Sequence, residues 1–172
     1  MEKWGAELYG DPCGGCGFIW SIDSEEAASF VKAVPDRYAV LLHGQDGTLT
    51  HPDLAWNAIG YVCHVADNLR LWAQRLVGAT LTGSGTLVPG YDQDLLARAC
   101  DYNRMPLAGA LWSLRHAAEQ WHEAIELAAV ADAVLVHAER GEQCLVDIVR
   151  NNAHDAYHHR WDIHRILTFS RT

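Results

Sequence analysis

The residues best suited to chemistry lie near the end of the printed sequence, where His154 and His158 stand four positions apart. In an α-helix, residues i and i+4 share one face, so both imidazoles can reach the same metal ion. His159 follows His158 directly and points about 100° away around the helix. We therefore expect His159 to lie outside this ligand set, as a supporting or surface residue. The pair still needs at least one more protein ligand.

His64 is the candidate for that third ligand. It lies within the apolar segment 60–66, where an inward-facing imidazole would be buried and would need a partner. Catalytic zinc sites use three protein ligands and leave a position for water or substrate. The alternative is an ordinary buried histidine satisfied by a hydrogen bond. A chain with ten histidines can also produce an i, i+4 pair by coincidence.

A second candidate is the Cys13-Gly14-Gly15-Cys16 segment, which lies among turn-forming residues. Its spacing suits two thiolates on one metal ion, but two further ligands are then needed and the sequence has no second C-x-x-C. It also suits a redox dithiol, although the βαβ setting typical of such motifs is missing. The third reading is a tight turn with two partly buried cysteines.

Apolar residues at helical spacing predict the elements that must position these groups. We expect helices over about 23–43, 53–77, 106–129 and 142–169, with a short helix over 92–102. Pro35 predicts a kink or break in the first. Residues 79–91 are predicted as a loop, and residues 130–138 as a helix tail. No segment alternates like a strand, so we predict an all-α four-helix bundle. It forms a single domain over 1–172, with an irregular Gly/Cys-rich segment over 1–22 and the helical bundle over 23–170.

Composition narrows the class of partner. The net charge of −9 and the lack of basic runs argue against nucleic acid. No apolar run is long enough to span a membrane. The N-terminus lacks the parts of a signal peptide, so we expect a reducing cytoplasm and free or metal-bound thiols. A small-molecule substrate is the expected partner, and a homodimer is plausible for a short bundle.

Two segments resemble the DinB/YfiT superfamily of bacterial four-helix proteins. The segment 56–67, from Trp56 through His64 to Asp67, is similar to the family's tryptophan-led helix with a metal-binding histidine. His154-Asp155-Ala156-Tyr157-His158 resembles its H-x-x-x-H motif on the final helix. The resemblance covers most of the chain but not the Cys13–Cys16 segment. It implies a DinB-like bundle and a divalent metal, zinc or nickel, on His64, His154 and His158. Asn57 stands where family members often have Ser.

The resemblance also implies a reaction, because characterised relatives use low-molecular-weight thiols such as mycothiol, bacillithiol or glutathione. We therefore expect a metal-dependent thiol S-transferase that acts on an electrophilic small molecule. Helix directions place Tyr61, Asn151 and Trp161 where they could contact substrate or cosubstrate. The alternatives are a metal-dependent hydrolase or lyase and a non-catalytic metal-binding protein. Water activation lacks an obvious carboxylate base, with Asp147 the nearest candidate. Asp155 and Asp67 are expected to be solvated or paired with Arg160 or Arg70.

Overall fold

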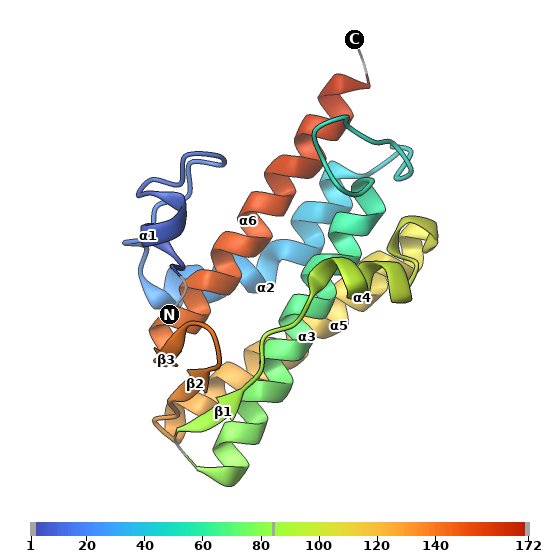
Figure 1. Ribbon diagram of the computed structural model, residues 1–172. Helices are drawn as coiled ribbons and strands as arrows, with labels where there is room; N and C mark the ends of the chain where they lie inside the picture. Colours follow the sequence, from blue (N-terminus) through green and yellow to red (C-terminus); the bar gives the residue numbers. More distant parts are fainter. Residues whose placement is uncertain (1–2, 84, 171–172) are drawn as a thin grey trace.

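Four long helices dominate the computed structural model, which describes residues 3–83 and 85–170 (Figure 1). They are α2 (Ser24–Leu41), α3 (Ala58–Thr82), α5 (Leu107–Val130) and α6 (Leu145–Phe169). The shorter helical elements are α1 (Ala6–Tyr9), α4 (Gln93–Ala99) and the 3-10 helix η1 (Tyr102–Arg104). The strands are β1 (Thr86–Val88), β2 (Leu135–His137) and β3 (Gly141–Gln143).

The long helices form the predicted bundle. α3 packs along α5 and against α6, and α2 packs against α5 and α6. Their apolar faces bury a core that includes Trp121, Tyr38 and Leu69. Burying such large side chains is the main stabilising contribution in a helical bundle. Within the core, Trp121 Nε1 donates to Asn152 Oδ1 over 2.7 Å, which ties α5 to α6.

The helix boundaries depart from the sequence prediction in two informative places. α3 begins at Ala58, later than predicted, because Asn57 is its N-cap and accepts a hydrogen bond from the Gly60 N–H. α3 also continues past Gly78 to Thr82. α2 is not broken at Pro35, since one helix runs through that residue. Pro35 is buried, so packing against the core holds the helix together despite the missing N–H.

The small sheet was not predicted. β1 pairs in parallel with β2, and β2 pairs antiparallel with β3. Residues 86–88 lie in the predicted loop, and residues 135–137 in the predicted helix tail. Strands of three residues are too short to show an alternating pattern, and their pairing partners are distant in sequence. The sheet places the 137–140 segment near the cavity described below.

The N-terminal segment is irregular, as predicted, apart from the single turn α1. Residues 3–23 lie beside α6 (Figure 1). Across the described residues, no helix combines the length and apolar character needed to cross a membrane.

Candidate metal centre

The structure divides the three predicted metal ligands between two clusters. His64 lies with Asp155 and His159, and one donor atom from each is within 4.8 Å of the others. The predicted pair His154 and His158 lies instead with Cys13 and Cys16, within the same limit. In residues 3–83 and 85–170, no cluster of this kind unites His64, His154 and His158.

The division follows from helix geometry. α6 carries two i, i+4 pairs one residue out of register, 154/158 and 155/159, and successive residues point about 100° apart. The face with Asp155 and His159 turns toward His64 on α3. The face with His154 and His158 turns toward the N-terminal segment. His159 does lie outside the 154/158 face, as expected. It lies beside His64, because the 155/159 face of α6, and not the 154/158 face, is the one opposite α3.

The His64–Asp155–His159 cluster has the spacing of a metal site. Asp155 Oδ1 lies 3.4 Å from His64 Nε2 and 3.5 Å from His159 Nε2. In a tetrahedral zinc site with bonds of about 2.0–2.1 Å, neighbouring donors are about 3.3 Å apart. The three donors therefore fit a divalent ion with little movement. Among the described residues, Asp155 forms no ion pair with an arginine and lies instead against His64 and His159, whereas Asp67 does form its predicted ion pair with Arg70.

Partner groups orient two of these donors. The Nδ1 atom of His159 lies 3.0 Å from Oδ2 of the buried Asp162. Asn68 Nδ2 donates to Asp155 Oδ2 over 2.9 Å, which leaves Oδ1 facing both histidines. Carboxylate–histidine pairs and bonded carboxylates of this kind fix ligand orientation in metal sites. The cluster thus has supporting contacts as well as suitable donors.

The electrostatics of the cluster suit a cation. Burial would raise the pKa of Asp155, but His64 and His159 hold that pKa well below its usual range. Burial would lower the pKa of His159, but Asp155 and Asp162 outweigh it and raise the pKa to about 9. The pocket therefore stabilises a positive charge among its carboxylates. A divalent metal can take the place of the proton on His159, since metal binding requires a neutral imidazole.

Aromatic rings fix the positions of both histidines. The Trp56 ring lies 5.0 Å from His64, and the Tyr61 ring stacks on His159 with centroids 5.1 Å apart. Of the three predicted substrate-contacting residues, Asn151 lines the cavity beside the cluster. Tyr61 is buried against His159 and Trp56. Trp161 packs edge-on against His158 and under Arg165.

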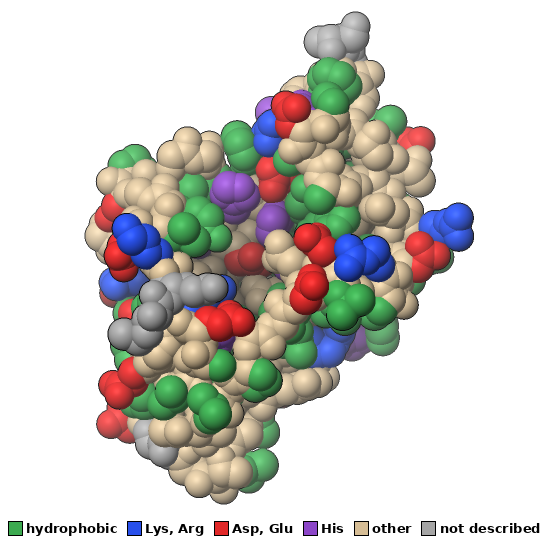
Figure 2. Space-filling model, viewed as in Figure 1, with side chains coloured by type: hydrophobic (Ala, Val, Ile, Leu, Met, Phe, Trp, Pro, Cys, Tyr) green, Lys and Arg blue, Asp and Glu red, His purple; other side chains and the backbone are tan. Residues whose placement is uncertain are grey.

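The cluster lies at the wall of a cavity of about 230 Å³. Figure 2 shows a hollow on this face with histidine and acidic side chains at its wall. The cavity also receives side chains from α1, α3 and the sheet connections. Its lining includes Tyr9, Asn68, Trp72, Arg75, Tyr91, His137, Glu139 and Arg140. Cavities of this kind, with converging polar groups, are the usual form of small-molecule sites.

Asp155 and His159 are the ligand-capable neighbours of His64 that sequence reasoning did not place there. The available signal was the run His154-Asp155-Ala156-Tyr157-His158-His159, which holds two ligand-capable pairs in adjacent registers. Asp147 is not a base at this site, because it accepts from the Cys144 N–H at the start of α6. Asn57 acts as a helix cap, and its Nδ2 donates to the Asn103 carbonyl.

The comparisons with known proteins bear on the fold. No family model and no curated protein matches the sequence. A solved structure, YfiT from Bacillus subtilis, is similar with a TM-score of 0.75 and 17% sequence identity, over 88% of this chain and 91% of that chain. YfiT is described as a probable metal-dependent hydrolase with an unusual four-helix bundle topology. At this identity the likeness establishes the fold.

Proposed function

The chain has the DinB/YfiT-type four-helix bundle, and on this fold we propose a metal-dependent enzyme whose divalent cation is held by His64, Asp155 and His159. One observation carries the proposal: three donors lie within 4.8 Å of one another at the wall of a cavity, with Asp155 Oδ1 3.4 and 3.5 Å from the two histidine nitrogens. Three protein ligands leave a coordination position for water or substrate. Two imidazoles and one carboxylate are a ligand set of catalytic zinc sites, and imidazole also suits nickel.

Bound at this position, the cation supplies positive charge that keeps a thiol or a water molecule deprotonated near neutral pH. The protein holds the ligands rigid: Asp162 and Asn68 orient His159 and Asp155, and Trp56 packs on His64. Tyr91 donates to Asn68 Oδ1 over 3.4 Å and so extends the network toward the cavity. The chain thus provides a preorganised position for a nucleophile.

For the reaction we propose transfer of a low-molecular-weight thiol to an electrophilic small molecule. The thiol would lose its proton to solvent, and its sulfur would form a bond to an electrophilic carbon of the substrate while the bond from that carbon to its leaving group, such as a halide, breaks. Arg75 and Arg140 line the same cavity and suit a carboxylate or another anionic group on the cosubstrate. Asn151 offers a further amide for hydrogen bonding. These groups favour a thiol that carries negative charge, such as glutathione or bacillithiol, over an uncharged one.

Hydrolysis is the second candidate, and the position of Glu139 favours it. Glu139 lines the cavity, so it could serve as the carboxylate base that the sequence did not reveal. The description of YfiT as a probable metal-dependent hydrolase points the same way. A Glu139→Gln variant separates the two reactions, because loss of a base impairs water activation more than it impairs attack by a thiol that is already ionised.

Metal analysis of purified protein is the first test. We expect that wild type binds a divalent ion that His64→Ala and Asp155→Ala lose from this site. His116→Ala is the matched control, since His116 is exposed and pairs with Glu119 outside the cavity. Retention of the full wild-type metal content by both site variants would refute the proposed ligands.

Activity assays on the metal-loaded protein then choose between the reactions. Monochlorobimane with glutathione, bacillithiol or mycothiol tests thiol transfer, and an activated ester tests hydrolysis. Metal-dependent conjugation that Glu139→Gln preserves supports transfer. Metal-dependent ester cleavage that Glu139→Gln abolishes supports hydrolysis and counts against the thiol reaction.

A further inference from the structure

We propose that Cys13, Cys16, His154 and His158 form a second metal site, a closed Cys2His2 zinc site that attaches the N-terminal segment to α6. The inference does not depend on the reaction proposed above. It rests on the geometry, burial and loop conformation of four residues from two distant parts of the chain.

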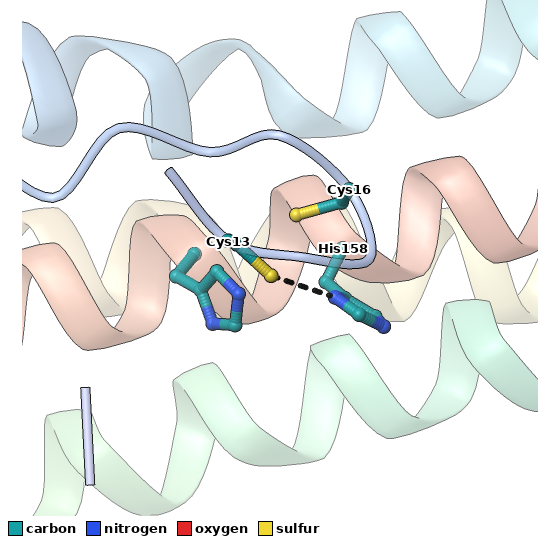
Figure 3. Close-up of side chains that lie close together, drawn as sticks. Cys13, Cys16 and His158 are labelled. Atoms are coloured by element: carbon teal, nitrogen blue, oxygen red, sulfur yellow. Dashed lines mark hydrogen bonds between the residues drawn. The ribbon is translucent and has the colours of Figure 1, made fainter. Parts of the chain in front are cut away.

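The four donors already lie at near-coordinating distances. One donor atom from each residue is within 4.8 Å of all the others. Cys13 Sγ lies 3.9 Å from His158 Nδ1, as marked in Figure 3. Zinc bonds of about 2.3 Å to sulfur and 2.0–2.1 Å to nitrogen place S and N donors about 3.6 Å apart in a tetrahedron. Small side-chain rotations therefore complete the site.

His154 supplies an independent sign that a ligand is required. Its side chain is only 4% exposed, and within the described part of the chain its Nε2 has no hydrogen-bond partner. A buried polar nitrogen without a partner is costly. Three rings surround it, with centroids 4.7, 5.4 and 4.4 Å away: Tyr9, Phe18 and Trp20. Aromatic rings cannot satisfy an imidazole nitrogen as a metal bond would.

The loop that carries the cysteines is folded to present both sulfurs to α6. Its backbone closes on itself, since the Cys13 N–H donates to the Phe18 carbonyl and the Gly17 N–H to the Cys13 carbonyl. Gly15 is in very close approach to α6, because a Cβ there would lie 3.0 Å from His158 Cε1. Figure 3 shows Cys13 and Cys16 on this loop above His158. The missing side chain at Gly15 thus allows the loop to lie directly against His158.

Four protein ligands fill a tetrahedron, which is the arrangement of structural rather than catalytic zinc. The His64–Asp155–His159 cluster differs in having three donors, which leaves a coordination position open. A redox disulfide between Cys13 and Cys16 is a weaker account, because it would give the buried His154 Nε2 no partner. His158 Nδ1 faces Cys13 Sγ, and its other ring nitrogen, Nε2, lies 3.9 Å from Asp162 Oδ2, which is beyond hydrogen-bond distance.

The second site has a consequence for the first. Tyr9, which is in the attached segment, lines the same cavity as His64, Asp155 and His159. His154 and His158 line it too. A metal on the cysteines and histidines would therefore fix one wall of the cavity, and α6 would carry both sites on neighbouring faces.

Metal content and cobalt spectroscopy test the proposal. The purified protein is stripped with a chelator, reloaded with Zn²⁺ or Co²⁺, and compared with Cys16→Ser and with Cys100→Ser, an exposed cysteine outside both clusters. We expect two metal equivalents in wild type and in Cys100→Ser, but one in Cys16→Ser. Cobalt-loaded wild type and Cys100→Ser should show a thiolate-to-cobalt charge-transfer band, which Cys16→Ser should lose or shift strongly.

A His64→Ala variant separates the two sites. It should lose the metal of the three-donor site formed by His64, Asp155 and His159, which we call the open site, and keep the thiolate–cobalt band. Because the cysteines lie outside the helical bundle, far-ultraviolet circular dichroism of Cys16→Ser should stay close to wild type. The proposal is overturned if wild type shows no thiolate–cobalt band, or if Cys16→Ser keeps both the band and the second metal equivalent.

Discussion

Replacing Gly15 by Ala should weaken the Cys2His2 site selectively. A Cβ at Gly15 would lie 3.0 Å from His158 Cε1, whereas carbon atoms pack at about 3.5–4.0 Å. The imidazole or the loop must therefore move by about 0.5 Å or more. Metal–ligand distances tolerate only about 0.2 Å, so the Gly15→Ala site must bind zinc with a displaced ligand.

The expected loss of zinc affinity is about 10- to 100-fold, the range seen when the support of a metal ligand is disturbed. Gly14→Ala is the matched control, because its Cβ would meet only the Tyr9 carbonyl oxygen at 3.8 Å, an ordinary contact. Both substitutions remove similar backbone freedom from the unfolded chain. The difference between them therefore isolates the contact with His158.

Competition with a chromophoric chelator measures the affinity. Both glycine variants also carry His64→Ala, which removes the open site. All the zinc that remains bound is then at the Cys2His2 site. Equal zinc affinities for Gly15→Ala and Gly14→Ala would refute the reasoning, because the close approach of the loop to His158 would then have no bearing on metal binding.

Three further predictions concern other parts of the structure. Asn68→Ala removes the donor to Asp155 Oδ2, so metal affinity at the open site should fall about 10-fold or more, which chelator competition would detect and an unchanged affinity would contradict. Asn152→Ala leaves the buried Trp121 N–H without its acceptor and should lower the free energy of unfolding by about 1–3 kcal/mol in urea denaturation, and an unchanged free energy of unfolding would contradict this. Burial raises the pKa of the Cys63 thiol from 9.0 to about 12, so the thiolate fraction of Cys63 at neutral pH should be roughly a thousandfold lower than that of an exposed cysteine with the ordinary pKa. Alkylation of the native protein followed by mass mapping should label the exposed Cys100 well before Cys63, and equal labelling would contradict the burial argument.

The two clusters give α6 an unusual density of ligand-capable residues. Neighbouring positions 154/155 and 158/159 point about 100° apart, so the same two turns of the helix contribute to both clusters. Asp162 lies near His158 and His159 together, at 3.9 and 3.0 Å. A substitution at Asp162 should therefore disturb both clusters, whereas a substitution at His64 or Cys16 addresses one.

The sequence alone determined the helical architecture and showed which side chains could bind a metal. Apolar residues recurring at helical spacing fixed the long helices of the bundle, because that periodicity is local and strong. His64, His154, His158, Cys13 and Cys16 were all recognised as ligand-capable from residue type and spacing. The strands were not recognisable, since each has three residues and its partners are distant in sequence.

Only the tertiary structure decided which ligand-capable residues meet. Spacing along α6 shows that His154 and His158 share a face, and equally that Asp155 and His159 share the next one. It does not show which face turns toward α3, because helix rotation is set by packing across the whole core. That rotation brings Asp155 and His159 to His64, and it leaves His154 and His158 facing the two cysteines of a segment more than a hundred residues away in the chain.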